Sequence, residues 1–293
     1  MPVSLVEDAP AKVNLTLRVL GRRADGYHDI ESLVAFADFG DRLTLAPGGP
    51  LKLTLGGPRA AQAGDDADNL VLKAAHALDA RIPGIVSGAF HLDKSLPVAA
   101  GIGGGSADAG AALRLLARAN DLARDDARLY DAARATGADV PVCLDPRPRL
   151  MCGIGEKLSP ALALPRLAAV LVNPGTALAT KAVFAGWTPG GKSAAPLAIG
   201  ALATLDREQF LQALANAPND LEAAAIKLAP VVADVLARLR ALAGCRLARM
   251  SGSGATCFAL FDSAAAAAAA AAALTGQYPQ WWVRATVLGG AAP

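Results

Sequence analysis

The sequence predicts a globular protein of two domains in which strands and helices are mixed. A length of 293 residues accommodates two domains of ordinary size, and 53% apolar with 18% charged residues is typical of a chain that buries a core. Strand-like segments fill the first quarter, and a strand, a glycine-rich loop and a helix then follow in order. The run Asp145-Pro-Arg-Pro148 resembles a linker, so we expect domains at residues 1–148 and 149–293.

Composition and charge exclude several classes of partner. The formal net charge is only +2 and the basic residues are scattered, so nucleic acid is not an expected partner. The first ten residues lack the basic and apolar regions of a secretory signal, and the alanine run at 264–273 is too short and too weakly lipophilic to span a membrane. The four cysteines form no C-x-x-C pair and have no histidine at ligand spacing. These features predict a cytoplasmic protein with reduced thiols and no metal site built from histidines.

Residues 3–20 alternate as a strand does. One face carries the apolar side chains of Val13, Leu15, Leu17 and Val19. The other face carries the polar side chains of Lys12, Asn14, Thr16 and Arg18. A polar face of this kind is usually solvated, so the pattern alone assigns no role to these side chains.

Asp25-Gly26 is a strong signal for a hairpin turn, and Tyr27 and His28 follow it directly. An aromatic ring and an imidazole at a loop exit can stack on a planar ligand and hydrogen-bond to it. They can equally cover the ends of the strands, and the residues alone leave both interpretations open.

The remaining elements follow the usual periodic and capping signals. Strands are expected at 30–39, 42–45, 51–55, 86–92, 167–172 and 280–288, and an apolar strand follows Gly254. Helices are expected at 69–80, 125–135, 206–216, 220–228, 231–243 and 264–273. Phe39-Gly-Asp41 is expected to break the second strand, Gly190 to Ala195 to form a loop, and a further segment to start at Thr180. Asp68 or Asn69 and Ser263 are the expected N-caps of the first and last helices.

The stretch from Lys94 to Ala109 contains four glycines, Gly101, Gly103, Gly104 and Gly105, before an alanine- and leucine-rich helix that Ser106 is expected to open. Backbone N–H groups and the positive end of a helix dipole form an anion site there, and phosphate is its natural ligand. The loop matches neither the G-x-G-x-x-G dinucleotide pattern nor the Gly-Lys-Ser/Thr end of a Walker loop. A flexible linker is disfavoured, because a strand and a strong helix enclose the stretch.

Two other loops have ordinary structural interpretations. Gly137 is expected to end the helix before it in the left-handed conformation, and Pro141 to prevent the helix from resuming. Asp139 is then held at a defined corner, where a turn or capping aspartate is the common case. Ser251-Gly-Ser-Gly254 precedes a strand, where two glycines usually make only a bend or bulge.

Four features in this order resemble the GHMP kinase superfamily. They are the Lys12/Asn14 strand, the Asp25-Gly-Tyr-His28 turn, the Pro97–Ser106 loop with Asp139 downstream, and the Ser251-Gly-Ser-Gly254 loop. The resemblance covers nearly the full chain. It implies an α+β fold of two domains, an N-terminal one like the second domain of ribosomal protein S5 and a ferredoxin-like C-terminal one.

Three motifs narrow the resemblance to one branch, namely Ala9-Pro-Ala-Lys-Val-Asn-Leu15, Gly26-Tyr-His28 and Gly137-Ala-Asp-Val-Pro141. They imply a kinase of the non-mevalonate isoprenoid pathway that uses ATP to phosphorylate the 2-hydroxyl of 4-diphosphocytidyl-2-C-methyl-D-erythritol. Mg²⁺ would be bound largely through phosphate oxygens, and its protein ligands are not implied.

The resemblance also implies roles for single residues. Asp139 would be the general base and Lys12 its cationic partner. The nucleotide would be bound by Lys94, Pro97, Gly101, Gly103, Gly104, Gly105 and Ser106. The cytidine-bearing substrate would be contacted by Asn14, Tyr27, His28 and Phe184.

The chain departs from the family pattern at Ala107, where relatives commonly carry a second serine, and in its last loop, where threonine often replaces a serine. Two alternatives stay open: another kinase of the superfamily, acting on homoserine, mevalonate or a sugar, and a nucleotide-binding regulator without catalysis. Tyr27 and His28 argue against the first, because a cytosine needs a stacking ring and a hydrogen-bonding partner. Lys12 and Asp139 argue against the second.

Overall fold

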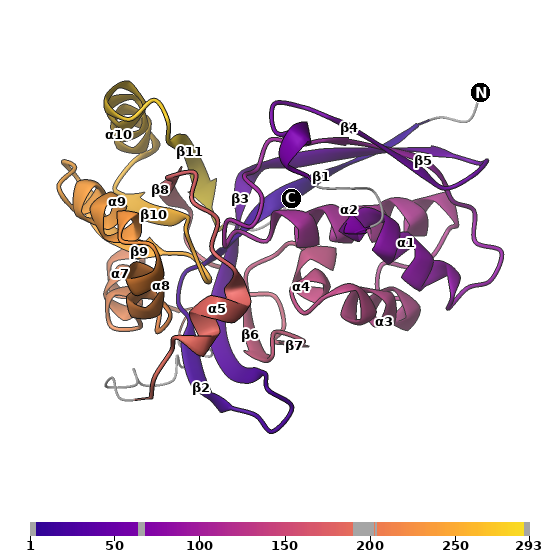
Figure 1. Cartoon of the computed structure of the whole chain (residues 1–293), viewed down its shortest axis with the longest axis horizontal. Coiled ribbons are helices and arrows are strands. Elements are labelled where there is room, and N and C mark those ends of the chain that lie inside the picture. The colour runs from indigo at the N-terminus through magenta and orange to yellow at the C-terminus, as the bar shows by residue number, and fades with distance from the viewer. Residues whose placement is uncertain (1–3, 64–67, 190–201, 203, 290–293) are drawn as a thin grey trace. The chain divides into compact units, whose positions relative to one another are not determined.

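The computed structural model describes residues 4–63, 68–189, 202 and 204–289 (Figure 1). Contacts divide the chain into two units. Unit 1 comprises Met1–Lys12, Phe39–Val98 and Gly103–Pro146. Unit 2 comprises Val13–Asp38, Ala99–Ile102 and Arg147–Pro293. Both units contain separate chain segments, and the single boundary after residue 148 stays a prediction.

Over its described residues, unit 1 combines a mixed sheet with four helices. Its strands come from β1 (Leu5–Asn14), the second part of β3 (His28–Pro47), β4 (Lys52–Gly56) and β5 (Gly88–Asp93). β5 runs antiparallel to β3 and parallel to β4, and β1 pairs with β3. The helices are α1 (Leu70–Asp79), α2 (Gly104–Ala119), α3 (Ala127–Thr136) and α4 (Val140–Leu144), and a 3₁₀ turn, η1, spans Ala60–Gln62. Figure 1 shows the four helices gathered along one face of this sheet.

Local signals explain where the first helices begin. The Asn69 side chain accepts a hydrogen bond from the Val71 N–H, which confirms Asn69 as the N-cap of α1. Asp126 caps α3 in the same way through the Arg128 N–H. Each cap satisfies a backbone donor that the first helical turn leaves without an intrahelical partner.

The expected break in β3 is wrong. The strand continues through Phe39-Gly-Asp41, because Gly40 lies against β1. A Cβ atom at Gly40 would stand 2.1 Å from the carbonyl oxygen of Ala9. The glycine therefore permits a close approach of two strands and makes no turn.

The segment after α3 also differs from expectation. Gly137 is extended, with a φ of 174°, and is not left-handed. Pro141 lies in the first turn of α4 and does not prevent a helix. Proline is accepted there because the first-turn N–H groups have no helical partner in any case. Asp139 consequently occupies the N-cap position of α4.

Unit 2 contains an antiparallel sheet in the order β11-β8-β10-β9. Its strands are β8 (Leu167–Asn173), β9 (Cys245–Met250), β10 (Cys257–Phe261) and β11 (Trp282–Leu288). α5 (Thr180–Ala185), α7 (Arg207–Ala215), α8 (Glu222–Leu228) and α9 (Val231–Arg240) join β8 to β9, and α10 (Ala264–Gln277) joins β10 to β11. This succession is the ferredoxin-like arrangement.

β9 has no counterpart among the predicted strands, and the loop expected at 190–195 lies outside the described residues.

A second group of strands in unit 2 surrounds the first part of β3. β2 (Arg18–Arg22) and β6 (Arg149–Gly153) both pair with β3 in antiparallel register, and β7 (Lys157–Leu158) pairs with β6. The turn between β2 and β3 confirms the predicted hairpin, because Arg22 faces His28 and Gly26 has a φ of 87°.

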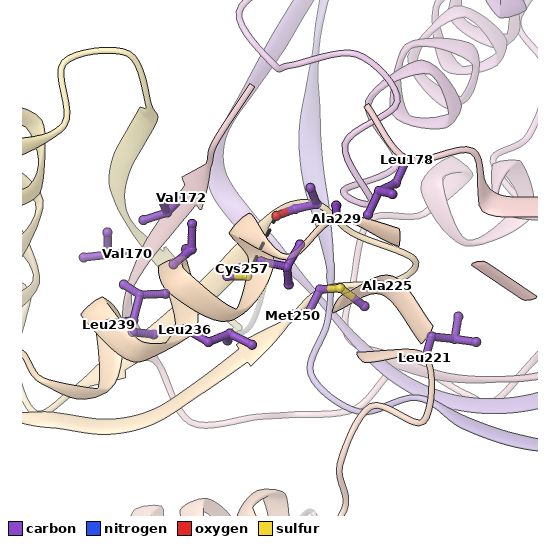
Figure 2. Close-up of a cluster of buried hydrophobic side chains, with 14 of the residues drawn as sticks. Val170, Val172, Leu178, Leu221, Ala225, Ala229, Leu236, Leu239, Met250 and Cys257 are labelled. Atoms are coloured by element: carbon purple, nitrogen blue, oxygen red, sulfur yellow. Dashed lines mark hydrogen bonds between the residues drawn. The ribbon is translucent and has the colours of Figure 1, made fainter. Parts of the chain in front are cut away.

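The core of unit 2 lies between its sheet and its helices (Figure 2). Figure 2 shows side chains from β8, β9, β10, α8 and α9 converging, among them Val170, Val172, Leu236, Leu239 and Met250. Every residue of β8 is buried, as its continuous apolar run predicts. α10 adds Ala267, Ala270 and Leu274, and Ser263 caps it as expected.

Candidate functional site

The polar row of the first strand segment is buried, so the solvated face that such alternation usually indicates is absent here. Lys12, Asn14, Thr16 and Arg18 are only 4%, 2%, 1% and 8% exposed. Buried polar groups carry a large desolvation cost unless they are hydrogen-bonded. The hydrogen bonds of Lys12 and Asn14 therefore show which groups offset the cost of burying these two side chains.

In unit 1, the Nζ atom of Lys12 donates a hydrogen bond to Oδ2 of Asp139 over 2.9 Å. Asp139 stands at the N-cap position of α4, yet its side chain makes no capping hydrogen bond. The Asp139 side chain is 38% exposed, whereas its cationic partner is 4% exposed. This arrangement leaves a carboxylate within reach of a solute, beside a buried positive charge. A carboxylate so placed can accept a proton from an alcohol.

The start of α2 lies against the same lysine. Gly103 is the N-cap of α2 with a φ of +62°, and a Cβ atom there would stand 3.1 Å from Cε of Lys12. The helix begins at Gly104 rather than at the predicted Ser106, because a left-handed glycine can end the loop two residues earlier. No side chain caps its first turn. The N–H groups in the first turn of this 16-residue helix therefore remain available to an anion next to Lys12.

Lys94 is buried in a cluster with Asp41 and Asp108, all within unit 1. Its Nζ atom lies 2.5 Å from Oδ2 of each carboxylate. Oδ1 of Asp41 accepts hydrogen bonds from the N–H groups of Ser95 and Leu96. Gly104 lies directly over the ammonium, since a Cβ atom there would stand 3.3 Å from Nζ. The cluster thus ties the end of β5 to the first turns of α2, on either side of the glycine loop.

Burial is the largest single influence on the pKa values of Asp108 and Lys94. It raises the pKa of Asp108 to about 7; the charge of Asp41 acts in the same direction and Lys94 opposes it. Burial alone would lower the pKa of Lys94, but the two carboxylates outweigh it and the pKa is raised. Oδ1 of Asp108 is buried with no hydrogen-bond partner among the described residues. The predicted site omitted Asp41 and Asp108, although a lone acidic residue in the alanine-rich start of α2 was a visible signal.

Ser251 joins the last small-residue loop to the rest of unit 2. Its Oγ atom accepts a hydrogen bond from the Asn14 N–H over 3.0 Å and donates one to the Gly101 carbonyl oxygen over 2.9 Å. The Thr256 N–H donates to the Ala100 carbonyl oxygen. Asn219, which sequence reasoning missed, donates to the carbonyl oxygens at 250 and 252. Ser251-Gly-Ser-Gly254 therefore does more than make a bend, because it holds residues of the glycine loop.

Three aromatic rings meet in unit 2. The imidazole of His28 stacks on Phe184 with ring centroids 5.1 Å apart, and the Trp187 indole meets it edge-on at 5.8 Å. Burial, with a smaller effect of the Arg22 charge, lowers the pKa of His28. Tyr27 is 59% exposed. Of the predicted substrate residues, His28 and Phe184 are therefore in contact, and Trp187 is an addition that the sequence did not reveal.

The remaining predicted residues take simple positions. Pro97 is buried, and Ser106 lies half-buried in the first turn of α2. The Asn14 side chain donates to Oγ of Ser32 over 2.7 Å.

All four cysteines are free. Within the described part of the chain, no group of three or more His, Cys, Asp or Glu side chains could hold a metal ion, and no helix is long and apolar enough to cross a membrane.

Family comparisons agree with this fold. The GHMP kinases N terminal domain matches residues 69–145, and the GHMP kinases C terminal domain matches residues 198–280. The chain belongs to the GHMP kinase family, and the predicted membership and α+β fold are confirmed. It is therefore an ATP-dependent kinase of a small molecule.

Two relatives that match nearly the full chain carry one name. A Rhodopseudomonas palustris protein called 4-diphosphocytidyl-2-C-methyl-D-erythritol kinase is 59% identical, over 97% of each chain. A Methylobacterium radiotolerans protein of the same name is 60% identical, over 97% of this chain and 99% of the other. A crystal structure of 4-(cytidine 5'-diphospho)-2C-methyl-D-erythritol kinase is 35% identical, with a TM-score of 0.78 over 98% of this chain and 100% of the other. A homoserine kinase from Cytophaga hutchinsonii, 20% identical with a TM-score of 0.73, shares the fold.

Proposed function

We propose that this chain transfers a phosphoryl group from ATP to the 2-hydroxyl of 4-diphosphocytidyl-2-C-methyl-D-erythritol, in the non-mevalonate route to isoprenoid precursors. The observation that carries the proposal is the Lys12–Asp139 pair beside Gly103. The family gives the reaction class, and relatives of 59% and 60% identity are named for this acceptor. A small molecule is thus the partner, and we place the protein in the cytoplasm.

In the proposed mechanism, Asp139 accepts the proton of the acceptor hydroxyl. A tertiary alcohol is a weak nucleophile, and a positioned general base typically contributes about 10² to 10⁴ in rate. Lys12, 2.9 Å from that carboxylate, supplies a positive charge where the phosphoryl group is transferred. Most of the remaining acceleration comes from holding the alcohol and the phosphoryl group in line.

The nucleotide phosphates are assigned to the uncapped start of α2, at Gly103, Gly104, Gly105 and Ser106. Gly101 and Pro97 shape the loop that leads there. Lys94 is expected near the nucleotide. Two buried carboxylates hold its ammonium next to Gly104, so we propose that it acts there by positioning this loop. Mg²⁺ bound with ATP would neutralise phosphate charge, and we propose that it is held largely through phosphate oxygens.

The cytidine end of the substrate is assigned to Asn14, Tyr27, His28 and Phe184. Tyr27 offers an exposed ring for stacking, and His28 offers a ring nitrogen for a hydrogen bond to the cytosine edge. We further propose that residues 1–148 bind ATP and perform catalysis, whereas residues 149–293 contribute to substrate binding.

The decisive experiment is a coupled assay with ATP and Mg²⁺ against a panel of acceptors. We expect turnover of the cytidyl substrate and no comparable turnover of homoserine, mevalonate or galactose. Turnover of one of those three without turnover of the cytidyl substrate would assign the chain to another branch of the family. Binding of ATP with no turnover of any acceptor would instead support a regulator without catalysis.

A further inference from the structure

Trp187 belongs to no predicted site, yet its indole contacts the imidazole of His28. Its indole meets the imidazole at 85° with ring centroids 5.8 Å apart, while Phe184 stacks on the imidazole at 30°. Edge-to-face and offset-stacked rings at such separations attract each other beyond their area of contact. Two aromatic rings therefore contact the imidazole at different angles and limit its rotation.

Both rings are anchored independently of His28. Trp187 follows the end of α5, and its backbone N–H donates to the Phe184 carbonyl oxygen over 3.2 Å. Phe184 and Trp187 also pack against the core of unit 2. His28 instead stands at the start of β3, directly after the β2–β3 hairpin. The core thus holds the two rings, and the rings hold a side chain at the exit of an exposed turn.

We propose that Trp187 is a positioning residue that sets the orientation of the His28 imidazole and thereby the selectivity of this site for a cytosine. The inference rests on the proposed function for the identity of the ligand. A pyrimidine edge presents donors and acceptors in one plane, so its recognition depends on where a ring nitrogen points. If that orientation is lost, the affinity for the cytosine end falls and the affinity for ATP does not change.

The contact itself is testable without substrate. The chain has three histidines, so the carbon-bound ring protons in an NMR spectrum of the full-length protein give few signals, and a His28→Asn variant assigns that of His28. In Trp187→Leu we expect the His28 signal to shift and the pKa of His28 to rise toward 6.5, because burial of the imidazole decreases. His76 and His91 are internal references and should not move.

Trp281→Leu is the matched control. Trp281 also belongs to unit 2 and stacks on Tyr278, with ring centroids 4.0 Å apart. It should leave the His28 signal unchanged. Trp187→Phe keeps an aromatic ring and should give most of the wild-type spectrum. This variant therefore tests the contact with His28 even where Trp187→Leu folds poorly. An unchanged His28 signal in folded Trp187→Leu would overturn the positioning role.

Binding then tests selectivity. With CDP as the calorimetric probe, we expect Trp187→Leu to weaken binding roughly 2- to 12-fold, the range that one aromatic contact spans, with the KM for ATP unchanged. Equal CDP affinity in Trp187→Leu and Trp281→Leu would overturn the inference. A wild-type protein that binds no CDP would defeat the proposed function and with it the cytosine selectivity, whereas the NMR result would still report on the contact between the two rings.

Discussion

The Nζ atom of Lys94 lies 2.5 Å from Oδ2 of Asp108, and both residues are only 3% exposed. Asp41 holds the same ammonium from a second direction, so one positive charge faces two buried carboxylates. Burial of a carboxylate favours its neutral form, and it raises the pKa of Asp108 to about 7. We therefore expect the charge of this cluster next to the glycine loop to change as pH rises.

The first prediction concerns stability and pH. Because Asp108 binds its proton more tightly in the native state than at its ordinary pKa of 3.8, its contribution to stability is complete below about pH 3.8 and is lost as pH rises through about 7. One group changes the free energy of unfolding by at most about 1.4 kcal/mol per pH unit. In urea unfolding from pH 4 to 8, Asp108→Asn should gain stability relative to wild type as pH rises.

Asp131→Asn is the control for that series, because the Asp131 side chain is 55% exposed on α3. It should keep the wild-type pH profile. A constant difference between Asp108→Asn and wild type across the pH range would show that Asp108 does not titrate in this interval.

The second prediction concerns the ammonium in the same cluster. Lys94→Met leaves Asp41 and Asp108 buried beside each other with no cation, and breaking a buried pair in this way costs about 3–5 kcal/mol. Lys73→Met removes an exposed ion pair to Asp68 and should cost about 1 kcal/mol or less. Denaturant midpoints compare the two variants directly. Similar losses in both would contradict a structural role for the cluster.

The third prediction concerns the proposed base. Asp139→Asn keeps the shape of the side chain but removes its basicity, so kcat should fall by about 10² to 10⁴. Binding of ATP should stay nearly unchanged, since the phosphate site is assigned to backbone groups of α2. Single-turnover kinetics and ATP calorimetry measure the two effects, with Asp131→Asn as control. Turnover close to that of wild type would remove Asp139 from the role of base.

The fourth prediction separates backbone strain from function. Gly103 and Gly84 both have positive φ, +62° and +81°, so alanine at either position should cost about 1–2 kcal/mol of stability. Only at Gly103 would the new Cβ meet Lys12, at 3.1 Å from Cε, whereas nothing lies within 4 Å at Gly84. We expect kcat to fall by about tenfold or more in Gly103→Ala alone, because small displacements of reacting groups are costly. Equal kcat values in the two variants would argue against alignment of Lys12 by the loop.

The sequence alone determined what depends on neighbours in the chain. The caps Asn69 and Ser263, the Asp25-Gly26 hairpin and the all-buried strand β8 follow from residues a few positions apart. The glycine loop before a strong helix was equally local, and it predicted an anion site without reference to any fold. The family resemblance added roles for Lys12 and Asp139 that their own neighbourhoods did not suggest.

The tertiary structure decided which distant residues meet. Lys12 and Asp139 are 127 positions apart, and Asn14 and Ser251 are 237 apart, so no local pattern encodes either contact. The same holds for Asp41 with Lys94 and for His28 with Trp187. Burial was also a tertiary outcome: the polar row that begins at Lys12 alternates like a solvated strand face, and only packing by other segments removes it from water. Local sequence specifies the conformation of each segment, whereas desolvation and long-range pairing arise only when the segments pack together.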